Sequence, residues 1–131
     1  MSEVMVQVRI SAAAPEADLG AAVWPGVTSV ACARVESAEH IERVDVEISR
    51  LERHRGIRPG QVEIKPIIET TRGVRHAPEI VRCSPRTKTI AMGPSITLEV
   101  GDDALEYARF ECELHARALG VTLLDPFAPH D

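Results

Sequence analysis

The stretch VEIKPIIETTRGVR, residues 62–75, decides the fold of this chain. Residues 62–68 predict a buried strand, with Glu69 as its final residue. The two threonines that follow can cap a short helix that runs to the end of the stretch. A strand that leads directly into a helix is the repeating unit of α/β proteins with parallel sheets.

The same strand-then-helix unit recurs along the chain. Short apolar runs predict five strands, near residues 4–10, 28–34, 62–68, 88–92 and 121–124. The clearest helix begins after Ser37, a good N-cap, and ends at Gly56; a second long helix, capped by Asp102, ends at Gly120. The strand centres are about 29 residues apart, close to the roughly 31 residues per unit of a (β/α)8 barrel. The alternation therefore predicts parallel strands joined by right-handed crossovers.

Composition and charge exclude several classes of function. The chain has 131 residues, of which 15 are Lys or Arg and 20 are Asp or Glu, giving a net charge of −5. A nucleic-acid binder needs clustered basic residues, so we expect no nucleic-acid partner. No apolar run approaches the roughly 20 residues of a membrane span, and no secretory signal is visible. Cys32, Cys83 and Cys112 are widely spaced, which predicts three thiols and a cytoplasmic protein.

Polar residues follow or end the predicted strands. Arg9 ends the first strand, Arg34 and Glu36 leave the second, Glu69 ends the third, and Asp125 follows the last. Parallel sheets place their functional sites at these carboxyl ends, where a carboxylate can bind a hard cation and an arginine can bind a substrate carboxylate. The alternative is structural: Glu69 caps the next helix, and Arg9 pairs with it or faces solvent. No glycine-rich phosphate loop or nucleophile elbow is present.

Several segments resemble one enzyme family in the right order. VESAE at 35–39 and IIETTRGV at 67–74 resemble signatures of the HpcH/HpaI aldolase and citrate lyase β-subunit family. VRIS at 8–11, AMGP at 91–94 and the passage from 119 to 125 resemble neighbouring parts of it. The resemblance covers nearly the whole chain and implies a TIM-barrel fold.

The resemblance also implies a chemistry. Members of the family cleave or form carbon–carbon bonds in CoA thioesters such as citryl-CoA or malyl-CoA, or in 2-keto acids, and use Mg²⁺. By resemblance, Arg9 is the substrate-binding arginine and Glu69 is a metal ligand. The position of the second metal-binding Asp holds Ile96, so we expect weak Mg²⁺ binding that Ile96→Asp strengthens.

These observations predict an α/β fold, a partial (β/α)8 TIM barrel with about five parallel strands and helices outside, in which residues 1–131 form a single incomplete domain. The implied function is that of a Mg²⁺-dependent carbon–carbon lyase acting on an acyl-CoA or keto-acid substrate. The alternative is a non-catalytic remnant, or a half-barrel subunit that acts through a partner chain. A small-molecule-binding module of flavodoxin-like topology is a third hypothesis.

An incomplete barrel also predicts association. Its two unpaired sheet edges and an inner face carrying apolar residues such as Ile67 favour a homo-oligomer or a complementing chain.

Overall fold

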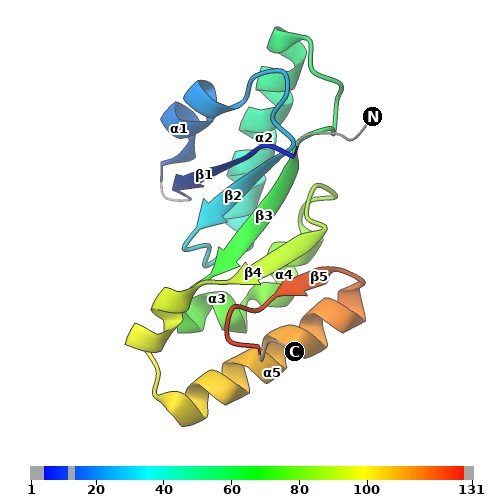
Figure 1. The fold of residues 1–131 in the computed structure, drawn as a ribbon. Coiled ribbons are helices and arrows are strands. Elements are labelled where there is room, and N and C mark those ends of the chain that lie inside the picture. The colour runs from blue at the N-terminus through cyan, green and yellow to red at the C-terminus, as the bar shows by residue number, and fades with distance from the viewer. Residues whose placement is uncertain (1–4, 12–13, 129–131) are drawn as a thin grey trace.

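A five-stranded parallel sheet organises the molecule (Figure 1). The computed structural model describes residues 5–11 and 14–128. The strands are β1 (Gln7–Ser11), β2 (Ser29–Ala33), β3 (Glu63–Ile68), β4 (Thr89–Met92) and β5 (Thr122–Leu124). They pair in chain order, β1-β2-β3-β4-β5, and each pair is parallel. This confirms the predicted arc of a TIM-barrel-like sheet.

Helices connect the strands, as the sequence predicts. They are α1 (Pro15–Ala22), α2 (Ala38–Arg55), α3 (Thr71–Arg75), α4 (Ala77–Arg82), the 3₁₀ helix η1 (Pro94–Leu98) and α5 (Asp102–Leu119). Ser37 caps α2 by accepting a hydrogen bond from the backbone N–H of His40. Gly56 and Gly120 end the two long helices in the left-handed conformation, which glycine adopts without steric cost. The N-cap of α5 is Gly101, one residue before the predicted Asp102.

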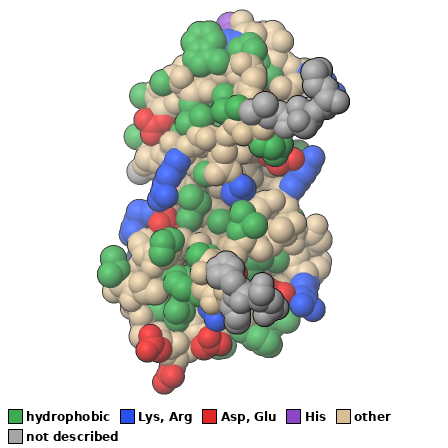
Figure 2. All heavy atoms as spheres, viewed as in Figure 1, with side chains coloured by type: hydrophobic (Ala, Val, Ile, Leu, Met, Phe, Trp, Pro, Cys, Tyr) green, Lys and Arg blue, Asp and Glu red, His purple; other side chains and the backbone are tan. Residues whose placement is uncertain are grey.

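The two faces of the sheet differ in polarity. Even-numbered strand residues such as Ile10, Val30 and Ile64 are buried in the core against the helices. The residues that alternate with them, among them Arg9 and Lys65, lie on the inner face of the arc, where Lys and Arg side chains cross the middle of the view in Figure 2.

In β5 the parity is reversed, so Leu123 packs on the core and Leu124 faces the inner side. The inner face therefore carries apolar residues beside charged ones: Ile67 pairs with Ala91, which pairs with Leu124, and Leu124 is 44% exposed. The expectation that this face carries apolar residues such as Ile67 agrees with this register.

The three cysteines are free thiols, as predicted. Burial raises the pKa of Cys32 to about 12 and the pKa of Cys112 to about 12, so both stay protonated at neutral pH. No helix in the described part of the chain is long and apolar enough to cross a bilayer.

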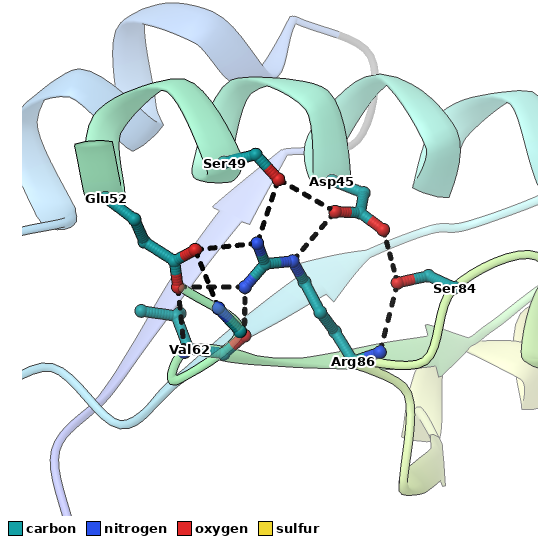
Figure 3. Close-up of polar contacts among 7 residues, drawn as sticks. Asp45, Ser49, Glu52, Val62, Ser84 and Arg86 are labelled. Carbon is teal, nitrogen blue, oxygen red and sulfur yellow. Dashed lines mark hydrogen bonds and ion pairs between the residues drawn. The ribbon is translucent and has the colours of Figure 1, made fainter. Parts of the chain in front are cut away.

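A buried arginine joins α2 to the loops before β3 and β4 (Figure 3). The Arg86 guanidinium donates two hydrogen bonds to Glu52, at 2.7 and 2.9 Å, and one to Asp45 at 2.8 Å. It donates two more, to the Ser49 hydroxyl at 2.9 Å and to the Val62 carbonyl at 3.0 Å. A guanidinium has five N–H donors, so five bonds satisfy it completely.

The carboxylates of this cluster are ionised. Burial opposes their charged forms, but hydrogen bonds and the charge of Arg86 outweigh it and hold the pKa values of Asp45 and Glu52 below their ordinary range. Glu52 also accepts the backbone N–H groups of Gly60 and Val62. The cluster is thus a fully paired ionic network at the amino-terminal end of the sheet.

We expect Arg86→Met to lower the free energy of unfolding by about 3–5 kcal/mol, because it leaves the carboxylates of Asp45 and Glu52 without their cation. Urea denaturation followed by circular dichroism measures this. The matched control is Arg50→Met, which removes an exposed pair with Glu47 and should cost less than about 1 kcal/mol. Equal losses in both variants would contradict the assigned role of Arg86.

The lowered pKa values also predict a pH dependence of stability. Glu52 and Asp45 have ordinary pKa values of 4.5 and 3.8. Because folding lowers them, their contribution is complete above the ordinary values and is lost as the pH falls through the folded-state values. Urea denaturation between about pH 6 and pH 3 should therefore show stability falling below about pH 4.5. The Glu52→Gln variant should be less stable at pH 6 and show a shallower fall; an unchanged slope would count against this.

Candidate functional site

The predicted site residues Arg9 and Glu69 meet at the carboxyl end of the sheet. Glu69 directly follows β3, and its alternation with the buried Ile68 turns its side chain toward the inner rim. Arg9 lies in the middle of β1, not at its end as predicted, and its guanidinium reaches to 3.7 Å from Glu69 Oε1. The Glu69 carboxylate is buried, whereas the Arg9 side chain is 64% exposed. Arg9 therefore presents a cation to solvent beside a fixed anion.

Two short hydrogen bonds hold the Glu69 carboxylate in place. The backbone N–H of Arg34 donates to Oε2 at 2.7 Å, and the Ser95 hydroxyl donates to Oε1 at 2.7 Å. Arg34 has φ 54°, in the left-handed region, so the bond to Glu69 helps to hold a strained turn after β2. Gly93 makes room for the carboxylate, because a Cβ there would lie 2.3 Å from Glu69 Cγ.

The structural alternative is only half right. Arg9 does pair with Glu69, but the cap of α3 is Thr70, whose hydroxyl accepts the backbone N–H of Gly73. Glu69 therefore does not cap α3, and its side chain lies at the inner rim of the sheet.

The other strand-end residues have separate surroundings. Asp125 accepts a hydrogen bond from Arg109 of α5 at 2.8 Å and another from the backbone N–H of Phe127. Glu36 lines a groove with residues of α2, α3 and α4, on the helix side of the sheet. The described contacts of Glu36 and Asp125 are therefore with these elements, and their placement near Glu69 stays a prediction.

Sequence reasoning missed two residues of this site. Gly93 directly follows β4, the strand next to β3, and Ser95 lies in η1. The available signal was the Gly-Pro-Ser turn at a strand end. That turn reaches Glu69 only because neighbouring parallel strands end at the same rim.

The sequence model of the HpcH/HpaI aldolase/citrate lyase family matches residues 1–130. The chain belongs to this family. No curated protein sequence matches it significantly.

Solved structures with the same fold include proteins named as citrate lyases. A citrate lyase from Burkholderia xenovorans aligns with 98% of the chain at 14% identity and a TM-score of 0.74. The citrate lyase β subunit of Mycobacterium tuberculosis aligns with 91% of the chain at 26% identity and a TM-score of 0.65. The CitE protein of the same organism, in complex with magnesium and acetate, aligns with 91% at 24% identity and a TM-score of 0.63.

The chain spans only part of these relatives. It covers 46% of the Burkholderia protein, 53% of the Mycobacterium β subunit and 50% of the CitE chain. The described sheet is correspondingly an arc of five strands rather than a closed barrel.

The described residues supply only part of the ligand set that a magnesium centre needs. Mg²⁺ requires oxygen ligands in near-octahedral geometry. Glu69 offers one carboxylate, and both of its oxygens already accept hydrogen bonds. At the predicted second ligand position, Ile96 is fully buried in the hydrophobic core. Among residues 5–11 and 14–128, no group of three or more His, Cys, Asp or Glu side chains could hold a metal ion.

The resemblance predicts that Ile96→Asp strengthens Mg²⁺ binding. Because Ile96 is buried, we expect this substitution to destabilise the fold instead. A carboxylate at this position would be buried in the core without a partner, so we expect a loss of more than about 3 kcal/mol in unfolding free energy. Ile96→Val, the control, should cost about 0.5–1.5 kcal/mol. Urea denaturation with and without Mg²⁺ measures both. A stable Ile96→Asp protein that Mg²⁺ stabilises further would contradict the assigned path of η1.

Proposed function

We propose that this chain is the substrate-carboxylate-binding part of a carbon–carbon lyase of the citrate lyase β-subunit or malyl-CoA lyase type. Its substrates would be 3-hydroxyacyl-CoA thioesters or 2-keto acids. We propose that residues 1–131 form one incomplete barrel unit that acts through a polypeptide supplying further strands, and that the protein is cytoplasmic. Family membership supports the reaction class, and the three free thiols support the location.

The observation that carries the proposal is the exposed guanidinium of Arg9 at the inner rim. Its ion pair with Glu69, at 3.7 Å, is long. Arginine binds carboxylates bidentately through two parallel N–H donors, which suits the carboxylate of a keto acid. Glu69, fixed by Arg34 and Ser95, orients Arg9 without neutralising it through a close bidentate pair. In this proposal Arg9 binds the substrate, and Glu69 holds Arg9 in position.

The role of Glu69 as a metal ligand remains a prediction. It would require oxygen ligands from the substrate and from residues outside the described part of the chain. The magnesium and acetate bound to the CitE relative support that prediction only at the level of the family.

The need for a complementing polypeptide has separate support. β1 and β5 are the outer strands of the described sheet, and each pairs with one neighbour there. Unpaired backbone groups at strand edges favour pairing with another strand. We therefore propose that lyase turnover requires strands added at these edges, and that this chain alone has little or none.

Calorimetric titration with oxaloacetate tests the role of Arg9. One charged bidentate contact should give weak, roughly millimolar binding. Arg9→Ala should raise the dissociation constant for oxaloacetate at least about tenfold. Arg9→Lys should give an intermediate value, because lysine keeps the positive charge but lacks the two parallel N–H donors of arginine. Arg50→Ala, far from the rim on α2, is the control for removal of a surface arginine and should bind like the native protein.

Absence of binding by the native chain, or binding that Arg9→Ala leaves unchanged, would refute the proposal and favour the remnant alternative. Titration with Mg²⁺ alone should give little heat. A Mg²⁺-dependent gain in oxaloacetate affinity that Glu69→Gln abolishes would establish the metal role of Glu69.

A further inference from the structure

The solvent-facing side of α5 carries an apolar stripe. Tyr107 is 65% exposed, Phe110 is 61% exposed and Leu114 is 48% exposed. At 100° per residue these three side chains point away from the buried side of the helix, which includes Ala108 and Cys112. In Figure 1, α5 runs along the lower boundary of the molecule. The stripe is therefore a surface feature and no part of the core.

The stripe is rich in aromatic residues, which are rare in the rest of the chain. The sequence has one Trp, one Tyr and two Phe, and the core is built from Val, Ile, Leu and Ala. Two of these four aromatic residues lie on one exposed helix face. Aromatic side chains are enriched at the centres of protein interfaces, where burying each one contributes strongly to affinity.

The spacing of the stripe matches that of a helix-pairing seam. Five residues follow one another at intervals of four, three, four and three positions: Asp103, Tyr107, Phe110, Leu114 and Arg117. This is the heptad spacing with which one helix packs along another. An acidic residue stands at one end of the seam and a basic residue at the other.

We propose that α5 pairs with α5 of a second copy of this chain, in antiparallel orientation about a two-fold axis. With the axis near Cys112, each Phe110 packs on the partner's Leu114, and each Tyr107 lies beside the partner's Arg117. Each contact then occurs twice, as an isologous interface requires.

Charge complementarity favours a second copy of this chain as the partner of α5 and the antiparallel direction of pairing. Arg117 would lie near the partner's Glu106, and the opposed helix dipoles attract. Within one copy, Arg117 already pairs with Glu113 and Glu106 with Arg109, so the contacts between copies would add to these pairs. A parallel pair would instead place Arg117 beside the partner's Arg117 and Glu106 beside the partner's Glu106.

The size of the seam sets the expected strength. One helix pair contributes three large apolar side chains from each copy, which is less than a standard interface, so the dimer should dissociate in the micromolar range. This proposal does not depend on the proposed function, because the seam contains neither Arg9 nor Glu69.

Sedimentation velocity from about 1 µM to about 300 µM, which brackets an interface of this size, tests the proposal. The mass should rise from that of one 14.3 kDa chain toward twice that value. Phe110→Glu should raise the dissociation constant at least about tenfold, because it places a charge in the central layer. Val46→Glu is the matched control: Val46 is an exposed apolar residue on α2, and this variant should dimerise like the native chain.

A charge exchange tests the antiparallel direction. Arg117→Glu should weaken the dimer, and adding Glu106→Arg to that variant should restore it. A native chain that stays monomeric over the whole range overturns the proposal. So does association that Phe110→Glu leaves unchanged, which would place the contact at the sheet edges instead. Failure of the charge exchange to restore the dimer overturns the antiparallel pairing. The Phe110→Glu variant should still bind oxaloacetate like the native chain, because Phe110 lies outside the proposed Arg9 site. This measurement shows whether dimerisation and substrate binding are independent.

Discussion

The five hydrogen bonds of Arg86 hold together segments that lie far apart in the sequence. Arg86 is 41 residues from Asp45, 34 from Glu52 and 24 from Val62. Because the guanidinium is planar and its donors are fixed, it positions α2, the loop before β3 and the loop before β4 at once. The strands that leave these loops then run parallel and finish at a common rim, so the geometry of the site depends on this network at the opposite end of the sheet.

The two ends of the sheet distribute polar groups differently. At the amino-terminal end, two carboxylates and one guanidinium satisfy one another and leave no charge available for a ligand. At the carboxyl end, a single carboxylate is fixed by Ser95 and the Arg34 backbone, and the Arg9 guanidinium beside it stays exposed. In parallel α/β sheets the carboxyl ends carry the chemistry, and the opposite ends contribute stability. This family member follows that division while placing Ile96 in the core where the resemblance expects a ligand.

The described surface offers two kinds of place where further polypeptide could bind, the sheet edges and the stripe on α5. Charged residues such as Arg9 and Lys65 stand among the apolar residues of the inner face, which helps an open arc of barrel strands to face water. The edges of β1 and β5 can accept additional strands, whereas the stripe on α5 can accept only a helix or another apolar face. Completion of the barrel and self-association are therefore separate events, because they use different surfaces and different kinds of contact.

The sequence by itself determined the order and type of the elements, because apolar periodicity and helix caps are local signals. It also brought Arg9 and Glu69 to one rim, because parallel strands end on the same side. Only the tertiary structure decided the partners of Glu69, since Ser95 and the Arg34 N–H reach it through the register of neighbouring strands. The same holds for Arg86: its bonds to Asp45, Ser49 and Glu52 exist only because the fold brings the loop before β4 against α2. The inner face likewise depends on strand parity, because a shift of one residue exchanges the buried and exposed side chains of a strand.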